Sequence, residues 1–398
     1  MQLGRGPLDL RRCREEFGKQ HRRYCRAIQE VKGSKIHRLE NLLLKSHSGK
    51  VLAVARAAKE KKYPVSPARL DLMASTLSCW EQPAAPATLY FKKKPGGGLR
   101  SIFSYRVMQA AQQYLVLWVL APRLRLHDGQ YAVPGRDRTA AVEKAKQLIE
   151  AGYDWVIRGD IKDCYPSMNG EKVLACLPGP RAVLRQVILP PLEQHLLYNH
   201  KHAALLGKVR RGLPPGAAST ALVAAAVLVP VLDGLPDGAA VILYVDDFLI
   251  FVSSKAAAVQ TMNTLREALW AAPVGNLQLK FCNIHHVVDG FGFLGYHIFR
   301  NISGGATARP RAAAVESLYE QLEAIDTDRS SDPFEDKWNR LIGWRCAYAA
   351  WDGGESIEDL LIAALSNHFP SDLEKLVQIL HLRAQMTRER EKAPRPLF

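Results

Sequence analysis

The sequence predicts an α+β fold, and its length allows about two or three subdomains. Short runs rich in Val, Ile, Leu, Tyr and Phe, which favour strands, are embedded among longer helical patterns. These runs do not alternate regularly with helices, as they would in a doubly wound α/β protein. The chain has 398 residues, 47% of them hydrophobic, which is enough for a sizeable core.

The first half of the chain is predicted to be mainly helical. Residues 8–62 carry many Lys and Arg side chains at helical spacing, and we expect two basic helices broken near Gly33 and Ser34. Prolines mark loops around the next helix, and apolar periodicity assigns the other elements. They are a short helix near 67–78, a hairpin over 87–106, helices over 107–120 and 137–151, and a strand from Trp155 to Ile157.

The second half is predicted to mix strands and helices. Small residues after a glycine-rich turn favour a closely packed helix, and two apolar runs around Asp246 favour a hairpin. The predicted elements are a helix over roughly 180–206, a turn from Gly212 to Gly216, a helix over 217–229, the hairpin, a helix over 255–272, strands over 277–288 and 291–299, and helices from 310 onward.

The charge of the chain points to a polyanionic partner. Its formal net charge is +15, and residues 1–62 hold 17 Lys or Arg against 6 Asp or Glu. Nucleic acid is the simplest partner for this excess. An anionic membrane fits less well, because no long amphipathic helix with a clean apolar face is obvious there.

Cysteine usage and hydropathy predict a cytoplasmic protein without a membrane span. The seven cysteines are scattered without a Cys-x-x-Cys pair, which argues against a structural zinc site and a disulfide framework. No secretory signal is visible at the N-terminus. The longest apolar run, Ala221 to Leu232, is too short to span a bilayer.

Tyr244-Val245-Asp246-Asp247 is the most informative segment. It lies between the apolar runs 239–243 and 248–252, so we expect a tight hairpin with both carboxylates at its tip. Adjacent carboxylates repel each other and persist most readily where a divalent cation neutralises them. An ordinary Asp-Asp turn is the alternative.

A second acidic segment, Arg158-Gly159-Asp160-Ile161-Lys162-Asp163-Cys164-Tyr165, follows the predicted strand at 155–157. If that strand pairs with the hairpin, Asp160 and Asp246 can share cations, as nucleotidyl transfer requires. Alternatively, Asp160 caps the end of the strand.

Several motifs in this order resemble those of reverse transcriptases. The matching segments are Lys92 to Lys94 with Arg100, Gln130 to Arg136, Gly159 to Tyr165, Gly212 to Ser219, Tyr244 to Asp247, and Gly292 to Tyr296. The resemblance covers about residues 87–300 and is closest to the prokaryotic branch with a group II intron-like palm, which includes retron, diversity-generating and defence-associated unknown-group enzymes.

The resemblance implies a right-hand polymerase with fingers, palm and thumb. Its expected domains are a basic helical extension over 1–62, fingers over 63–154, a palm over 155–300 with a fingers insertion at about 171–211, and a helical thumb over 301–398. Asp160, Asp246 and Asp247 would be catalytic. They and the backbone at Ile161 would hold two Mg²⁺ ions, with Mn²⁺ as a substitute.

The resemblance also implies how substrates bind. Lys93 and Arg100 would contact the phosphates of the incoming dNTP, and Tyr165 would exclude a ribose 2′-hydroxyl. Packing at the strand–helix junction is the alternative role of Tyr165. Pro215 stands near the position where many relatives carry Gln. The residues expected to contact template or primer are Gly212, Pro214, Gly216, Ser219, Phe293, Leu294 and Gly295.

Trp338, Trp344, Tyr348 and Trp351, mixed with Arg340 and Arg345, predict a thumb helix that lies against a duplex. An amphipathic core helix is the alternative.

The expected activity is RNA-directed DNA synthesis on a dedicated structured non-coding RNA, which yields an RNA–DNA duplex. The resemblance to bacterial reverse transcriptases with this domain organisation implies a role in anti-phage defence. The alternatives are template-independent or protein-primed DNA synthesis, a diversity-generating or intron-type reverse transcriptase, and a catalytically silent RNA-binding scaffold.

Overall fold

The computed structural model describes residues 8–81, 87–93, 97–133, 135–190, 196–198, 212–327, 333–351 and 373–392. Its mixed helices and strands confirm the predicted α+β class. The described helices include none that is both long and apolar enough to cross a bilayer.

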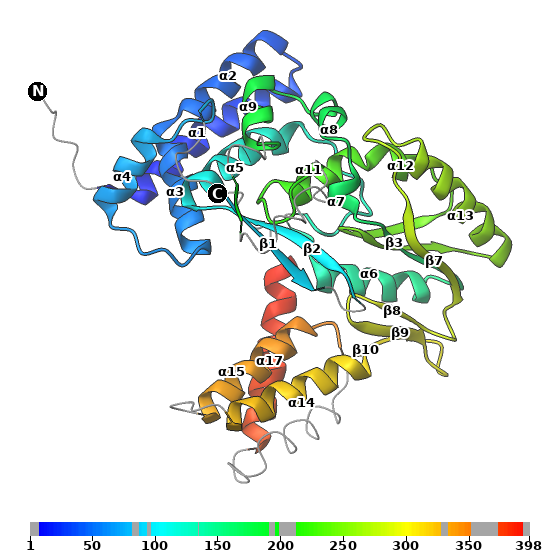
Figure 1. Ribbon diagram of the computed structural model, residues 1–398. Helices are drawn as coiled ribbons and strands as arrows, with labels where there is room; N and C mark the ends of the chain where they lie inside the picture. Colours follow the sequence, from blue (N-terminus) through cyan, green and yellow to red (C-terminus); the bar gives the residue numbers. More distant parts are fainter. Residues whose placement is uncertain are drawn as a thin grey trace, which may run out of the picture.

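The N-terminal region forms three helices rather than the two expected, namely α1 (Leu10–Gln29), α2 (Gly33–Lys45) and α3 (His47–Glu60). The additional break falls at Ser46, whose side chain accepts a hydrogen bond from the Gly49 N–H and so caps α3. These helices and α4 (Pro67–Thr76) pack around α5 (Val107–Leu120) on one side of the molecule (Figure 1).

The palm is a four-stranded antiparallel sheet in the order β5-β6-β3-β7. Its strands are β3 (Trp155–Ile161), β5 (Ala240–Tyr244), β6 (Asp247–Val252) and β7 (Leu279–His286). Strand β3 continues beyond the predicted 155–157, so Asp160 lies within the strand rather than after it.

Helices cover both faces of this sheet. Ile157, Ile161 and Ile250 pack toward α11 (Thr220–Val227), α12 (Val229–Asp233) and α13 (Lys255–Trp270) in one core. Val156 and Phe251 pack toward α6 (Arg138–Glu150) in another. Burial on both faces explains why β6 is continuously apolar from Phe248 to Val252.

Two smaller sheets flank the palm. Strands β1 (Ala87–Lys93) and β2 (Leu99–Ser104) form the predicted hairpin, and β4 (Leu196–Tyr198) pairs with β1 in parallel. Strand β4 lies within the 180–206 range that we expected to be helical; residues 199–206 are outside the described residues. Pairing with the free edge of β1 outweighs the local helical pattern there.

Strands β8 (Phe291–Phe293), β9 (Tyr296–Arg300) and β10 (Ala306–Pro310) form the third sheet. The sequence pattern predicted a single strand over 291–299, which the structure divides into β8 and β9 at the Leu294–Gly295 turn. It did not predict β10, which completes the sheet by pairing with β9.

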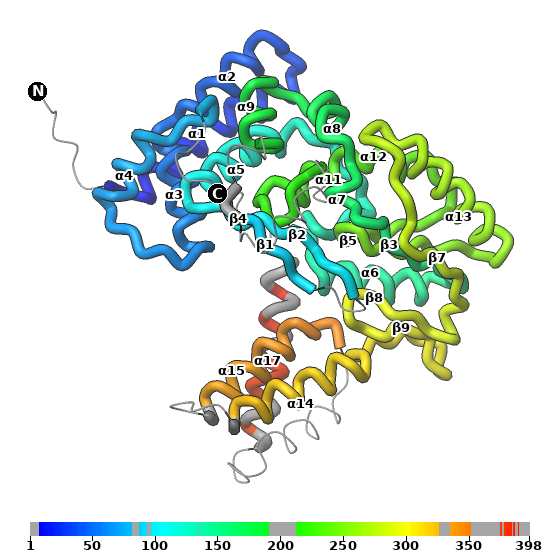
Figure 2. The backbone as a smooth tube through the Cα atoms, viewed as in Figure 1, coloured from blue at the N-terminus to red at the C-terminus, as the bar shows by residue number. Residues whose placement is uncertain are grey.

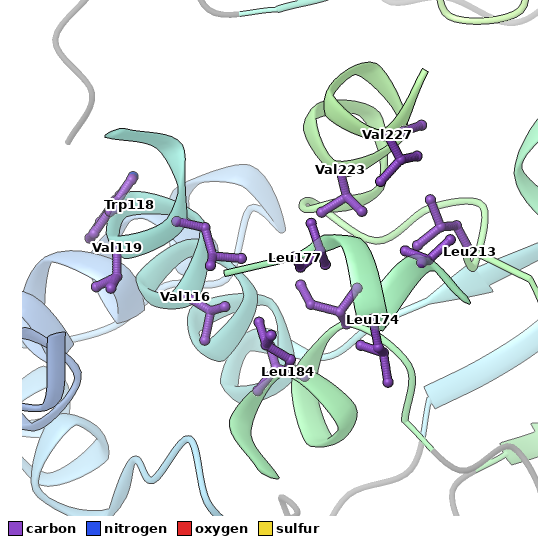
Figure 3. Close-up of a cluster of buried hydrophobic side chains, with 14 of the residues drawn as sticks. Val116, Trp118, Val119, Leu174, Leu177, Leu184, Leu213, Val223 and Val227 are labelled. Carbon is purple, nitrogen blue, oxygen red and sulfur yellow. The ribbon is translucent and has the colours of Figure 1, made fainter. Parts of the chain in front are cut away.

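Short helices connect the palm to the helical region around α5. They are η1 (Ala121–Arg123), α7 (Cys164–Ser167), α8 (Gly170–Cys176) and α9 (Arg181–Val187). Figure 3 shows Val116 and Val119 of α5 in one apolar cluster with Leu174, Leu184 and Val223. This shared core fixes the fingers relative to the palm.

The C-terminal helices are α14 (Ala312–Thr327), α15 (Pro333–Ala347) and α17 (Leu373–Lys392). They form a separate layer below the sheets (Figure 1). Their core joins that of α6 and the β8–β9 hairpin, because Leu318, Leu341, Tyr348 and Leu380 belong to the same buried cluster.

Candidate active site

The strand register brings the two acidic segments together. Asp160 on β3 is the cross-strand partner of Asp247 on β6, and the Ile161 N–H donates a hydrogen bond of 2.9 Å to the carbonyl oxygen of Asp246. The pairing of β3 with β7 shifts between Asp160 and Ile161. Asp160 therefore lies beside the tip of the β5–β6 hairpin, as the sequence predicts.

The hairpin tip is a two-residue turn. Tyr244 pairs with Asp247, so Val245 and Asp246 form the turn, and Val245 has a φ of 65°. A β-branched residue is rare in this left-handed region and is strained there. The turn places Asp246 at the end of the hairpin and Asp247 at the first position of β6.

The carboxylates of Asp160 and Asp246 are in an electrostatically unfavourable environment. Burial raises the pKa of Asp160, and the charge of Asp246 raises it further. Burial also raises the pKa of Asp246, while Arg100 and Lys280 act in the opposite direction. Buried carboxylates that repel each other bind a divalent cation favourably, since the cation relieves both penalties.

The environment of Asp247 differs from that of Asp246. Burial raises its pKa to about 6, and the charge of Arg158 and a backbone hydrogen bond at Leu294 oppose this shift. Its Oδ1 atom is buried and has no hydrogen-bond partner among the described residues. Asp247 thus connects the palm hairpin to the turn between β8 and β9, which includes Leu294.

The expected group of three metal-ligating side chains is not already assembled. Among the described residues, no three His, Cys, Asp or Glu side chains are grouped so that they could hold a metal ion. The donors that fit Mg²⁺ are the adjacent Asp160 and Asp246. Mg²⁺ needs only one or two protein carboxylates, because waters and substrate phosphates complete its coordination.

Cations from three elements act on the carboxylates. Arg100 on β2 and Lys280 on β7 lower the pKa of both Asp160 and Asp246, and Arg158 on β3 acts on Asp160 and Asp247. The sequence predicts the role of Arg100 but not the roles of Lys280 and Arg158. Lys280 is a single cation in β7 without a motif, and Arg158 belongs to the second acidic segment but had no predicted contact.

The β1–β2 register separates Lys93 from Arg100. Lys92 is the cross-strand partner of Arg100, whereas Lys93 is the partner of Leu99. Partners in an antiparallel pair share a face, and successive residues alternate. Lys92 therefore shares the face of Arg100, and the phosphate-binding role of Lys93 stays a prediction. Residues 94–96 are outside the described part of the chain.

Tyr165 lies close to the carboxylates and to the glycine-rich turn. Burial raises the pKa of its hydroxyl, with smaller effects from Asp246, Tyr244 and Arg100. Its carbonyl oxygen accepts a hydrogen bond of 2.9 Å from the Leu213 N–H. A Cβ atom at Gly212 would lie 2.3 Å from that same oxygen, so only glycine fits there.

The same turn is attached to the fingers hairpin. The Phe103 N–H of β2 donates to the Pro215 carbonyl oxygen at 2.8 Å, and Gly216 has a φ of 105° with Phe103 O 2.3 Å from where its Cβ would be. Thr220 Oγ1 donates to the Pro214 carbonyl oxygen at 2.8 Å. Ser219 is completely buried, so its expected contact with the template stays a prediction.

The β8–β9 turn is fixed by groups from the thumb. Phe293 is completely buried, Leu294 and Gly295 have φ values of 46° and 85°, and the Arg311 N–H donates to the Gly295 carbonyl oxygen at 3.0 Å. Tyr296 Oη donates to the Ala347 carbonyl oxygen at 3.3 Å. The turn thus has little freedom to move.

Arg138, the first residue of α6, lies between this turn and the thumb. Its guanidinium carbon is 5.3 Å from the ring centre of Tyr296 and 4.6 Å from that of Tyr348. Its Nε and Nη2 atoms are buried and have no hydrogen-bond partners in the part of the chain that the structure describes. Two aromatic faces therefore offset the cost of burying this cation.

The segment from Gln130 to Arg136 extends the edge of β5. The Tyr131 N–H donates to the Leu243 carbonyl oxygen at 2.8 Å, and the Leu243 N–H donates to the Gly129 carbonyl oxygen at 2.7 Å. Pro134 is outside the described residues. This segment supports the hairpin from the side, next to the site.

Comparison with models of protein families gives a match over about half of this chain. The family model for "Reverse transcriptase (RNA-dependent DNA polymerase)" matches residues 92–298. No curated protein matches the chain.

Solved structures are more distant. The RNA-dependent RNA polymerase of a human picorbirnavirus aligns with 13% identity and a TM-score of 0.46, and its insertion-loop deletion mutant with 14% and 0.47. Apo telomerase from Candida tropicalis aligns with 11% identity and a TM-score of 0.44. The alignments cover 76–78% of this chain and 61–63% of those chains.

Proposed function

Because the chain belongs to the reverse transcriptase family, we propose that it is an RNA-directed DNA polymerase that adds dNTPs to a 3′-hydroxyl. The observation that carries this proposal is the juxtaposition of Asp160 and Asp246 beside the cations Arg100 and Lys280.

Asp160 and Asp246 would hold the metal ions, and the backbone at Ile161 fixes their spacing through its hydrogen bond to Asp246. Bound there, Mg²⁺ (or Mn²⁺) would supply the positive charge that activates the attacking hydroxyl and stabilises the leaving pyrophosphate. Arg100, Lys280 and Lys92 supply positive charge for the triphosphate of the incoming nucleotide. Asp247 would support the site from the side of Leu294.

Tyr165 and the Gly212–Gly216 turn would border the nascent base pair. The aromatic ring of Tyr165 disfavours a ribose 2′-hydroxyl, which selects dNTPs. The tight contact of Gly212 with the Tyr165 carbonyl oxygen keeps the turn close to that ring. The β8–β9 turn at Phe293–Gly295 would position the primer end. Pro215 replaces the usual Gln, so the backbone of this turn would make the template contact.

We further propose that the template is a dedicated structured non-coding RNA and that the enzyme acts in bacterial anti-phage defence. The positive charge of the chain supports an RNA partner. The defence role rests on resemblance to the prokaryotic branch of the family alone.

Primer extension tests the activity. Purified protein is incubated with a labelled DNA primer on an RNA template, dNTPs and Mg²⁺. We expect Asp160→Asn and Asp246→Asn each to reduce the rate at least about 10³-fold, since each removes metal-binding charge. Asp237→Asn is the matched control, because Asp237 is exposed in a loop. Full activity of the Asp246→Asn protein would refute the mechanism.

Sequencing the product separates templated from untemplated synthesis. A product complementary to the added RNA supports the proposal, whereas a product that forms equally without RNA identifies template-independent or protein-primed synthesis. A wild-type protein that binds RNA but incorporates no dNTP would be a scaffold.

A further inference from the structure

Helix α1 has a continuous row of cations on its outward face. Lys19, Arg22, Arg23 and Arg26 are all exposed and follow the spacing i, i+3, i+4, i+7. Residues at this spacing lie on one side of a helix with their Cβ atoms about 5–6 Å apart. We call these four residues the α1 basic stripe.

The stripe has little compensating negative charge. Arg11 and Arg12, earlier in the helix, pair with Glu15 and Glu16 at 3.3 and 2.9 Å. Within the described residues, no ion pair within 4.0 Å involves any member of the stripe. Lys19 and Arg26 weakly lower the pKa of Glu16 and Glu30, but these carboxylates are paired with Arg12 at 2.9 Å and Lys32 at 2.5 Å. The positive charges of the stripe are therefore available to bind a negatively charged ligand.

The opposite face of α1 is anchored in the protein core. Phe17 and Tyr24 are completely buried. Tyr24 Oη lies 3.0 Å from both Glu40 Oε1 and the Val119 carbonyl oxygen, either of which can accept its one proton, and Arg123 donates to Glu40. The helix is therefore rigid, and its apolar face is not available to a membrane.

The stripe is remote from the catalytic hairpin. Helices α1 to α4 lie on one side of α5, and β3, β5 and β7 lie on the other (Figure 2). A ligand on the outward face of α1 therefore does not occupy the template–primer site.

We propose that the α1 basic stripe binds the sugar–phosphate backbone of structured RNA at an anchoring site outside the active site. This inference rests on the proposed function, because it assigns a surface to the RNA partner. Arg and Lys at regular spacing suit phosphate contacts, which are largely independent of sequence.

An acidic protein is a less suitable partner. Interfaces between proteins are centred on buried aromatic or apolar anchors. Between Leu10 and Gln29, no large hydrophobic side chain is exposed. Val31, just beyond the end of α1, is exposed, but the helix that carries the stripe offers charge without an apolar anchor of its own.

The test compares two variants with the same loss of charge. The stripe variant carries Lys19→Gln, Arg22→Gln, Arg23→Gln and Arg26→Gln. The control carries Lys59→Gln, Lys172→Gln, Lys255→Gln and Arg266→Gln, which are exposed positions on other elements. The probe is an RNA hairpin with a stem of about 16 base pairs, and Kd is measured as a function of salt.

We expect the stripe variant to bind the hairpin at least tenfold more weakly (about 1.4 kcal/mol) and to lower the slope of log K against log salt by about 3. The control variant should lower this slope by less than half as much as the stripe variant does. Circular dichroism confirms that each variant is folded. An unchanged Kd in a folded stripe variant overturns the proposal, as does an equal loss in the control.

Primer extension on a short primer–template separates this inference from the proposed function. The stripe variant should keep the wild-type rate, within about twofold, at saturating primer–template. If the wild type has no polymerase activity but binds RNA through the stripe, only the proposed function fails. A second titration uses polyglutamate in place of the RNA hairpin. If the stripe variant loses affinity for polyglutamate but keeps its affinity for RNA, the partner is an acidic protein and the RNA site is refuted.

Discussion

At the scale of single residues, Asp247 couples stability to pH. In the folded protein burial raises its pKa from 3.8 to about 6, so the folded state binds the proton more tightly than the unfolded chain. Its stabilising contribution is therefore complete below about pH 4 and is lost as the pH rises through about 6. At neutral pH the ionised, buried Asp247 carboxylate therefore destabilises the metal-free protein.

We expect Asp247→Asn, which cannot ionise, to raise the free energy of unfolding by about 1–2 kcal/mol at pH near 7.5 and by less than about 0.5 kcal/mol at pH near 4. Urea unfolding in the presence of EDTA measures both values. Equal changes at the two pH values would show that charge is not the cause.

Gly212 is a second residue with a specific consequence. A Cβ atom there would meet the carbonyl oxygens of Tyr165 and Pro166 at 2.3 and 2.6 Å, and backbone atoms cannot move aside cheaply. We expect Gly212→Ala to lower the free energy of unfolding by about 1–3 kcal/mol and to slow primer extension. Chemical denaturation checks the first effect.

Gly33 provides the matched control, because a Cβ atom there would have no heavy atom within 4 Å. Gly33→Ala should change stability by no more than about 0.5 kcal/mol. Similar losses in both variants would mean that helix or turn propensity, rather than the contact with Tyr165, is responsible.

At the scale of elements, Arg138 links α6, the β8–β9 hairpin and the thumb. Replacing it with Met keeps its length but removes the charge between the rings of Tyr296 and Tyr348, an interaction worth about 2 kcal/mol when desolvated. We expect Arg138→Met to raise the KM for primer–template up to about tenfold and shorten products, with little change in single-nucleotide kcat.

Two further variants make this prediction specific. Arg138→Lys keeps the charge and should recover part of the affinity. Arg309 lies 5.3 Å from the ring of Phe299 on an exposed position of β10, so Arg309→Met removes a similar interaction that involves neither α6 nor Tyr348. If Arg309→Met has the same effect, the thumb contact of Arg138 is not the cause.

Local sequence patterns predicted some elements and not others. The hairpin around Asp246 and the β1–β2 hairpin were predictable, because apolar runs and turn residues act over short distances. Strands β4 and β10 were not, because each depends on a partner strand rather than on its own composition.

The same distinction applies to the site. Asp160, Asp246 and Arg100 belong to recognisable motifs, and the structure brings them together. Lys280 acts on Asp160 and Asp246 only through the pairing of β7 with β3, which no local pattern encodes. Arg158 precedes Asp160 by two residues on β3 and reaches Asp247 through the pairing of β3 with β6. The face shared by Lys92 and Arg100 required the strand register.

At the scale of the whole molecule, the N-terminal helices form one structure with the fingers. Glu40 is completely buried and is bonded to Tyr24 and Arg123, and Phe17 packs against Trp118 of α5. The basic extension and the fingers therefore share a core, which should couple their unfolding.

We expect Glu40→Ala to lower the free energy of unfolding by about 1–3 kcal/mol, because it leaves the half-buried Arg123 without its carboxylate partner, while Tyr24 keeps its hydrogen bond to the Val119 carbonyl oxygen. Circular dichroism and tryptophan fluorescence should report one coincident transition. Glu15→Ala is the control, since Glu15 pairs with Arg11 on the surface and should change stability by less than about 1 kcal/mol. Separate transitions would show that the extension unfolds independently.

The positive φ of Val245 has opposite consequences for the thermal stability and the catalytic rate of the protein. A glycine there would relax the turn and gain roughly 1 kcal/mol, because glycine tolerates a positive φ. The freed tip would then hold Asp246 less firmly, so a thermostable variant obtained in this way should be a slower enzyme.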